Sequence, residues 1–388
     1  MSVSIHRARW AIAAVFFVNG GLLGSWAPQV PLVKERLGLS PADLGLALLV
    51  LAIGAVTAMP FSGILSGRFG SSVVTRTAIL LQMVLLPFVA VVPSFAILCP
   101  LLFAFGAANG VCDVAMNAHG VEVERRYARP ILSSLHGMWS VGGFVAASAA
   151  AGLLALVTPL SHLLIVIAAA AVILLVALTN LLPADADKGP AEGSFVWPNR
   201  VVLAIGGLTA LVFLAEGAML DWAAVYLRDD LLSSPSFAAT GYAAFAGGMA
   251  IGRFAGDAIR RRVSAVRLVR WSALAAALFL ALGVASGSPL VVVAAFGATG
   301  LALANMAPVL FGAAGRLPGQ SSAAGVAAAA TCGYFGFLAG PPVIGFVAEA
   351  FSLGAGFVLL SLGCLVVAVA AVAARPADLA PDPDGTVG

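Results

Sequence analysis

Residues 161–182 read SHLLIVIAAAAVILLVALTNLL, a run that contains no Asp, Glu, Lys or Arg. At 1.5 Å per residue, a helix of this length is about 33 Å long, which is enough to cross the ~30 Å hydrocarbon core of a bilayer. A membrane barrel strand would need alternating polar and apolar positions, whereas this run is apolar on all sides. The run therefore predicts a transmembrane helix.

The rest of the chain resembles this run in composition. Of the 388 residues, 61% are hydrophobic and 10% are charged, whereas soluble domains average about 25% charged residues. These charges are too few to cover a water-facing globule, so we expect an all-α membrane protein surrounded mostly by lipid. Twelve transmembrane helices are predicted, over residues 9–30, 41–65, 72–92, 95–119, 131–157, 161–182, 200–227, 236–258, 264–286, 289–313, 321–347 and 354–374.

Features at three helix ends refine this prediction. The first run is too long for a signal peptide and lacks a cleavage pattern, so we interpret it as the first helix. Pro341 and Pro342 should bend or end the eleventh helix. Ser40, Pro41 and Asp43 resemble half of a capping box at the start of the second helix, so Asp43 is given no transport role.

Arg and Lys residues predict the orientation of the bundle. With the amino terminus inside, 17 of the 20 fall in cytoplasmic segments, and only Lys34, Arg36 and Arg228 fall on the other face. Because cytoplasmic loops carry the excess of these residues, we expect a multi-pass protein of the cell (inner) membrane with both termini cytoplasmic. The net charge of +3 is then a topology signal and does not indicate nucleic-acid binding.

The chain divides into two similar halves. Residues 183–199 read PADADKGPAEGSFVWPN, a composition typical of a linker. The halves match at an offset of about 191 to 196 residues, in Ser25-Trp26-Ala27 with Asp221-Trp222-Ala223, Ser40-Pro41 with Ser234-Pro235, and Phe105-Gly106-Ala107 with Phe296-Gly297-Ala298. Six helices per half make the repeats parallel, around a central cavity. We expect a first bundle over 1–182, a cytoplasmic linker over 183–199, a second bundle over 200–376 and a disordered cytoplasmic tail over 377–388.

Two loops carry a recognisable motif. Residues 63–70 read GILSGRFG and residues 252–262 read GRFAGDAIRRR. Both resemble the signature loop of the major facilitator superfamily, roughly G-x-x-x-D-R-x-G-R-R, although the first copy has Ser66-Gly67 where an acid is expected. The resemblance covers the whole chain through length, topology and repeat. It implies a cytoplasmic gate formed by Arg68, Gly252, Arg253, Gly256, Asp257 and Arg261; alternatively, these arginines only enforce topology.

Polar residues within the fourth and fifth helices indicate a site. Asn109, Asp113 and Asn117 are spaced by four, so they share one helical stripe, which should face a water-filled cavity. His136 and Ser140 form a similar stripe on the fifth helix, with Trp139 beside it. Ionisable groups in a membrane cost roughly 2.5–3.5 kcal/mol on insertion scales, so Asp113 with His136 predicts a proton site. The alternative is that the two residues only hold helices together.

Other spans contribute further candidates. Glu216 lies near the middle of the seventh helix, and Asp221 and Trp222 lie toward its outer end. Five residues separate the two acids, so they cannot both face one narrow cavity. Glu216 is the better coupling candidate, because Asp221 can pair with Arg228 or lie in the outer vestibule.

Amides and aromatic rings complete the predicted site. A ring-shaped solute needs aromatic surfaces and amide groups. The residues predicted to bind solute are Asn19, Trp26, Asn109, Asn117, Trp139, Trp222, Asn305 and Tyr334. Those predicted to couple protons are Asp113, His136, Glu216 and Asp221.

The acids and the GRFAGD loop most resemble the fucose-permease-like branch of the superfamily, which carries sugars together with protons. That branch has an acid in the first helix, where this chain has Asn19, so Asp113 and Glu216 would have to serve. The resemblance implies symport of a sugar-like or nucleoside-like solute. Proton-coupled multidrug efflux is an alternative, disfavoured because the fifth helix lacks a Gly-Pro ending. Anion exchange is disfavoured because no Arg or Lys is expected mid-membrane.

Other classes of protein find little support. No P-loop, H-E-x-x-H or G-x-S-x-G pattern occurs, so we expect neither an ATP-driven pump nor an enzyme. A non-transporting scaffold would not need an inward polar stripe. The four cysteines stand singly and are interpreted as small packing residues. We expect no cofactor and no metal; the expected partners are a small-molecule solute, protons and the lipid bilayer, with the chain a monomer.

Overall fold

The computed structural model describes residues 4–127, 131–186, 200–317 and 322–378, and these are almost entirely helical. In chain order the long helices are α1 (Ile5–Trp26), α3 (Pro41–Phe69), α4 (Ser71–Leu85), α5 (Phe95–Tyr127), α6 (Leu132–Leu153), α7 (Pro159–Ala177), α8 (Arg200–Val225), α9 (Pro235–Arg260), α10 (Ala265–Ser286), α11 (Pro289–Leu303), α13 (Ser322–Ala350) and α14 (Leu353–Val369). Shorter segments extend them: α2 (Gln29–Leu37), η1 (Leu86–Ala90), η2 (Leu178–Asn180), η3 (Tyr226–Asp230), α12 (Met306–Ala314) and η4 (Ala370–Asp378).

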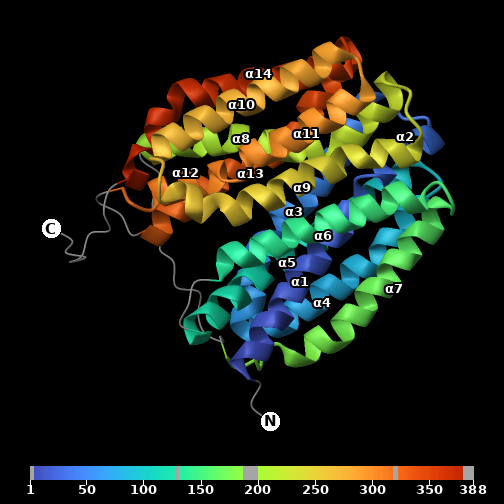
Figure 1. Cartoon of the computed structure of the whole chain (residues 1–388). Helices are drawn as coiled ribbons and strands as arrows, with labels where there is room; N and C mark the ends of the chain where they lie inside the picture. Colours follow the sequence, from blue (N-terminus) through green and yellow to red (C-terminus); the bar gives the residue numbers. More distant parts are fainter. Residues whose placement is uncertain (1–3, 128–130, 187–199, 318–321, 379–388) are drawn as a thin grey trace.

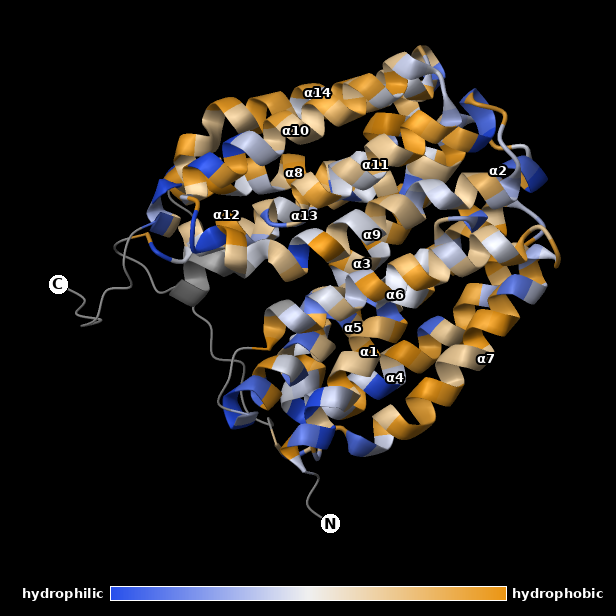
Figure 2. Ribbon diagram, in the orientation of Figure 1, coloured by the Kyte–Doolittle hydropathy of each residue, from blue (hydrophilic) through white to orange (hydrophobic). Residues whose placement is uncertain are grey.

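These helices run side by side as one bundle (Figure 1). Within the described residues, ten helical segments are long and apolar enough to cross a membrane. The two other long helices, α6 and α9, have 22 and 26 residues and lie among these ten. Apolar residues cover the sides of the bundle, and hydrophilic residues gather near the helix ends (Figure 2). The expected all-α membrane fold is confirmed.

The helix ends lie on two faces. At one, here called the terminal face, α1 begins beside η2, and Arg260 of α9 pairs at 3.0 Å with Asp378 in η4. At the other, the opposite face, the Gln29 side chain of α2 donates to the carbonyl oxygen of Pro159 at the start of α7. Successive passes alternate between the faces, so both described ends of the chain lie at the terminal face (Figure 1).

The same helix pairs recur in the two halves. In the first half α1 packs against α6 and α3 against α5; in the second, α8 packs against α13 and α9 against α11. Two further pairs, α6 with α9 and α3 with α13, join the halves. Each pair maps onto the other when the halves are exchanged, as expected for two parallel repeats related by an axis along the bundle. The interface between the halves therefore lies where α6 meets α9 and where α3 meets α13.

Gly45 of α3 and Gly345 of α13 bring the halves together near the opposite face. A Cβ atom at Gly45 would lie 2.9 Å from the carbonyl oxygen of Pro341, and one at Gly345 would lie 2.7 Å from that of Pro41. Side chains do not tolerate such distances to a backbone, so this contact requires glycine on both helices.

Of the two expected effects of proline in α13, a bend or an end, the second does not occur. Pro341 and Pro342 do not end the helix, which continues to Ala350. Membrane helices tolerate proline where neighbouring groups satisfy the freed carbonyls. At the start of α3, Ser40 and Asp43 form a complete capping box, each side chain accepting from the other residue's backbone N–H.

Three other boundaries differ from the predicted runs. α5 continues eight residues beyond 119, to Tyr127. The tenth pass is broken between α11 and α12, at Asn305. The last pass continues through η4 to Asp378, four residues beyond the predicted end at 374, and the carbonyl of buried Ala377 accepts there from Arg260.

Candidate functional site

A cluster of amides links four helices of the first half. Buried Asn19 of α1 donates to the side-chain oxygens of Gln82 on α4, at 3.1 Å, and Asn109 on α5, at 3.3 Å. Its own side-chain oxygen accepts from the indole N–H of Trp139 on α6 at 2.9 Å. Both polar atoms of Asn19 are therefore used within the protein. Asn19 positions Asn109 and Trp139, which are partly exposed between the halves.

Asp113 of α5 bridges the two halves. Its carboxylate accepts from the hydroxyl of Tyr334 on α13 at 3.2 Å and from the Asn117 side chain at 3.3 Å. All three side chains are partly exposed, so a solute between the halves can reach them. The predicted stripe on α5 thus contacts the second half at Asp113, where Tyr334 joins it.

Aromatic rings surround Tyr334 on the second half. Phe213 of α8 lies 5.8 Å from the Tyr334 ring, 4.6 Å from Phe337 and 5.9 Å from Phe311, measured between centroids. These separations are typical of favourable aromatic pairs. An apolar wall therefore stands next to the Asp113 carboxylate.

Arg253 forms a second bridge between the halves. Its guanidinium donates to the hydroxyl of Ser140 on α6 at 2.6 Å and lies 5.9 Å from the centroid of the Trp139 ring. It also forms an ion pair with Glu216 of α8 at 3.6 Å. The two charged side chains are only 17% and 12% exposed, so the pair is largely removed from bulk water.

This position differs from one expectation. The motif that contains Arg253 was assigned to a loop, and the expected role of Arg253 in the cytoplasmic gate stays a prediction. The motif instead begins within α9, and Arg253 lies seven residues before that helix ends. A glutamate on the neighbouring helix α8 compensates its charge. Glu216 is accordingly not the unpaired carboxylate that its sequence position suggested.

Among the described residues, His136 and Asp221 form no ion pair or side-chain hydrogen bond with Arg253 or Glu216, although His136 lies one helical turn from Ser140. His136 is exposed and packs edge-on against Phe16, at 5.4 Å between ring centroids. No hydrogen bond or ion pair in the described part of the chain joins it to Asp113. Asp221 is 9% exposed and also lacks such a contact. It does not pair with Arg228, which bonds to Glu35 of the first half.

Three predicted solute ligands are structural. Trp26 and Trp222 are at most 1% exposed, and both indole N–H groups are buried without a hydrogen-bond partner among the residues that the structure describes. They occupy equivalent positions in the helical core of the two halves. Asn305 precedes α12 and donates to the carbonyl oxygen of Gly252 at 2.7 Å. It stabilises the break in the tenth pass instead of facing the other half.

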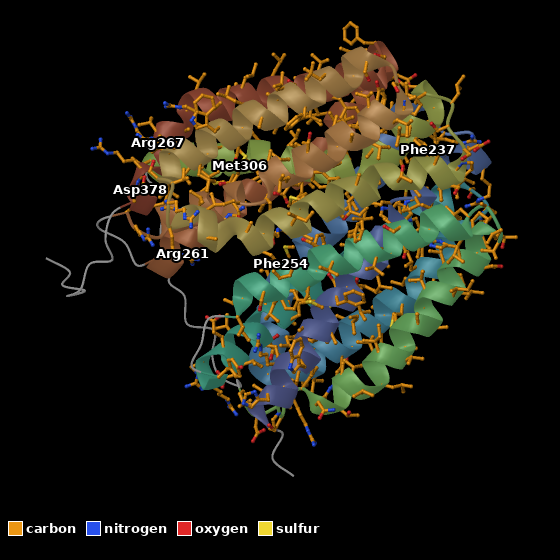
Figure 3. The ribbon with its side chains drawn as sticks, viewed as in Figure 1. Phe237, Phe254, Arg261, Arg267, Met306 and Asp378 are labelled. Atoms are coloured by element: carbon orange, nitrogen blue, oxygen red, sulfur yellow. The ribbon has the colours of Figure 1, made fainter. Side chains whose placement is uncertain are left out.

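The remaining gate candidates lie near the terminal face. Gly252 and Gly256 pack closely against α11 and Asn305, where a Cβ atom would clash. Arg68 is exposed and stacks on Phe69. Arg261 is exposed as well (Figure 3). The side chain of Asp257 lies outside the described residues, so the predicted latch stays a prediction.

Polar contacts between the halves differ at the two faces. At the opposite face, Lys34 pairs with Asp229 at 2.6 Å and Glu35 with Arg228 at 3.0 Å. We call these two ion pairs the clasp. At the terminal face, the ion pairs among described residues stay within one half, as in Glu122 with Arg125 and Arg126, or Arg260 with Asp378. The halves are thus fastened at the opposite face.

Two residues of the candidate site were not predicted from the sequence, one in the amide cluster and one among the aromatic rings. Gln82 is a polar residue inside a predicted span, and the cost of burying its amide was the available signal. Phe213 carried none, because an aromatic residue in an apolar helix is ordinary. Its role depends on α12 and α13 being beside α8.

Comparisons with known proteins agree with this architecture. The family model described as Major Facilitator Superfamily matches residues 10–270. An uncharacterized MFS-type transporter of Yersinia pestis is 38% identical over 358 residues, covering 92% of this chain and 93% of the relative. An uncharacterized transporter of Sinorhizobium fredii is 33% identical over 365 residues, covering 93% and 96%. The crystal structure of the nucleoside transporter NupG superposes with a TM-score of 0.73 at 15% identity, covering 95% and 98%.

Proposed function

Because the chain belongs to the major facilitator superfamily and is therefore a membrane transporter rather than an enzyme, we propose that it carries a small polar, ring-bearing solute in symport with protons. The solute class is sugar-like or nucleoside-like. The observation that carries this proposal is the hydrogen bond from Tyr334 to Asp113, which joins the halves beside both amides and aromatic rings.

The two sides of this contact suit different parts of such a solute. Asn109, Asn117 and Asp113 offer donors and acceptors to hydroxyl groups, whereas Phe213 and Tyr334 offer ring faces. A solute between them would replace the bond from Tyr334 to Asp113 with bonds to itself. Alternating access then follows from rocking of one half against the other around a fixed site.

Protons enter through the two carboxylates of the site. Asp113 holds Tyr334, and Glu216 holds Arg253. Protonation of Asp113 weakens its contact with Tyr334 of the other half. Protonation of Glu216 weakens its contact with Arg253, whose side chain also touches the other half. The orientation we propose, with the terminal face cytoplasmic, rests on the excess of Arg and Lys there.

Proton-coupled efflux of cationic drugs is the second candidate. The aromatic cluster beside Asp113 supports it, because aromatic faces and a carboxylate attract organic cations. Arg253 opposes it, since its positive charge lies at the same interface and repels a cation. A solute screen separates the two proposals.

The experiment combines a ligand screen with one substitution. Purified protein is screened by thermal shift against sugars, nucleosides, amino acids and cationic drugs, since a ligand of the folded state raises its apparent stability. Uptake of each stabilising solute is then measured in proteoliposomes for wild type, Tyr334→Phe and Tyr127→Phe. Tyr127, whose hydroxyl accepts from Arg9 near the terminal face, is the control.

We expect a neutral ring-bearing solute to stabilise the wild type, and Tyr334→Phe to weaken its uptake about 10-fold, as for one lost hydrogen bond to a charged group. Tyr127→Phe should leave uptake unchanged. Stabilisation by cationic drugs alone would favour efflux. Equal uptake in both variants would exclude Tyr334 from the site.

A further inference from the structure

A groove outside the proposed solute site runs between α1 and the end of α7, near the terminal face. It has a volume of about 540 Å³ and is lined by His6, Arg7, Trp10, Ala11, Ala14, Ile173, Val176, Ala177 and Asn180. On α1 these positions fall on one helical face, and on α7 and η2 they are spaced by three and four. Two facing stripes therefore form its walls.

The chemistry of the groove changes along its length. His6, Arg7 and Asn180 lie at the end nearest the terminal face, and Ala14 and Ile173 lie one to two helical turns deeper. Trp10, which is 64% exposed, lies between these two regions. Tryptophan is enriched at this depth, the boundary between membrane and water. The groove is cationic where lipid headgroups lie and apolar where acyl chains lie.

Arg7 is available for an anion. It is exposed, and it forms no ion pair with any carboxylate among the described residues. Its neighbour Arg9, by contrast, donates to the hydroxyl of Tyr127. At the same face of the second half, Arg260 pairs with Asp378, and Arg316 donates to the carbonyl of Ala377. In the second half, the chain itself therefore supplies the groups that accept hydrogen bonds from these arginines, whereas no described carboxylate pairs with Arg7.

The groove opens on the outer surface of the bundle. Val172, Leu175 and Val176 on the same part of α7 are between 67% and 73% exposed. Exposed apolar side chains of this density on a membrane protein contact lipid. A soluble anion would use Arg7 but leave the apolar walls unfilled.

We propose that this groove binds an anionic phospholipid, with the phosphate at Arg7 and one acyl chain between α1 and α7. Basic pockets between membrane helices bind anionic headgroups in this way. The site is independent of the solute site, because α1 and α7 line it from outside the interface of the halves.

The test counts bound lipid by native mass spectrometry on detergent-purified protein. Dioleoylphosphatidylglycerol is titrated, with dioleoylphosphatidylcholine as the neutral comparison and glycerol phosphate as the headgroup without chains. Arg7→Gln removes the cation. Arg200→Gln is the matched control, since Arg200 is the first residue of α8, Arg7 lies in the first turn of α1, and both are exposed.

We expect one retained phosphatidylglycerol in wild type and Arg200→Gln, and an apparent Kd about fivefold higher in Arg7→Gln, as for the loss of one basic residue near anionic lipid. Ala14→Phe, which fills the apolar part, should weaken binding while the protein still elutes as one sharp peak. Equal affinity in the two arginine variants, equal retention of phosphatidylcholine, or competition by glycerol phosphate would each overturn the proposal.

Discussion

Arg253 of α9 pairs with Glu216 of α8 while donating to Ser140 of α6, so one guanidinium holds an acid of its own half and a hydroxyl of the other. Protonation of Glu216 removes the nearest negative charge from this arrangement. The contact between α6 and α9 then changes when the acid gains a proton. In the proposed symport, this geometry is how proton binding acts on the relative position of the halves.

The first prediction concerns this coupling. Asp113→Asn and Glu216→Gln should each leave expression intact and remove most of the pH dependence of net uptake, because neither amide can exchange a proton. Exchange of internal for external solute should be less affected. Uptake and counterflow in proteoliposomes across a pH gradient measure both, with Asp185→Asn, an exposed acid at the terminal face, as control. Proton-driven accumulation in the double variant would show that both acids are structural.

The second prediction concerns the ion pair itself. Arg253→Gln should destabilise the protein by about 1–3 kcal/mol, because it leaves the Glu216 carboxylate largely buried without its partner. Adding Glu216→Gln should recover most of this loss. A double-mutant cycle from unfolding in detergent measures the interaction free energy. Additive effects of the two substitutions would mean that the pair contributes nothing.

The third prediction concerns the clasp. Because exposed ion pairs contribute about 0.2–1 kcal/mol each, breaking both should shift the equilibrium between the states that are closed and open at the opposite face about fivefold. Lys34→Asp with Arg228→Asp should therefore open the opposite face. Spin labels at Ile97 of α5 and Leu290 of α11, both exposed, report the separation of the halves there. Exchanging the charges, as Lys34→Asp with Asp229→Lys, should retain the short distance; an unchanged distance distribution in every variant would contradict this role.

The fourth prediction concerns the signature loop. When the terminal face closes, Asp257 and Arg261 should contact neighbouring helix ends, as the family resemblance implies. Asp257→Asn should then increase labelling of a cysteine introduced at Arg68, at the end of α3. Arg262→Gln, next to Arg261, is the control. No change in labelling after Asp257→Asn would mean that the loop only sets topology.

Much of the fold could be predicted because each helix carries its own signal. Length and apolarity determine a membrane helix locally, and α7 with η2 covers Pro159–Asn180, two residues from the predicted run of 161–182 at each end. The α5 stripe was predicted for the same reason, since Asn109, Asp113 and Asn117 share one helix. Helix ends in water, as at Tyr127, lack this signal and were misjudged.

Contacts between distant helices could not be predicted in this way. Arg253 was assigned to a loop because its surroundings resemble the signature loop, and only tertiary structure brings the compensating charge of Glu216 to it. Trp26 and Trp222 were expected in the site because tryptophan often binds rings. A helix face alone does not distinguish the interface of the halves from the core, where both lie.

The indole of Trp139 has an optical consequence. Its N–H bonds to Asn19 and its ring faces the Arg253 guanidinium, whereas Trp26 and Trp222 are enclosed by apolar side chains. Emission from an indole depends on the charges and polar groups around it. A solute that displaces Arg253 from Ser140 changes those surroundings for Trp139 and leaves the two enclosed rings as an internal reference. We therefore expect a change in Trp139 emission, measured against the emission of the other five tryptophans, to report occupancy of the proposed site without an added dye.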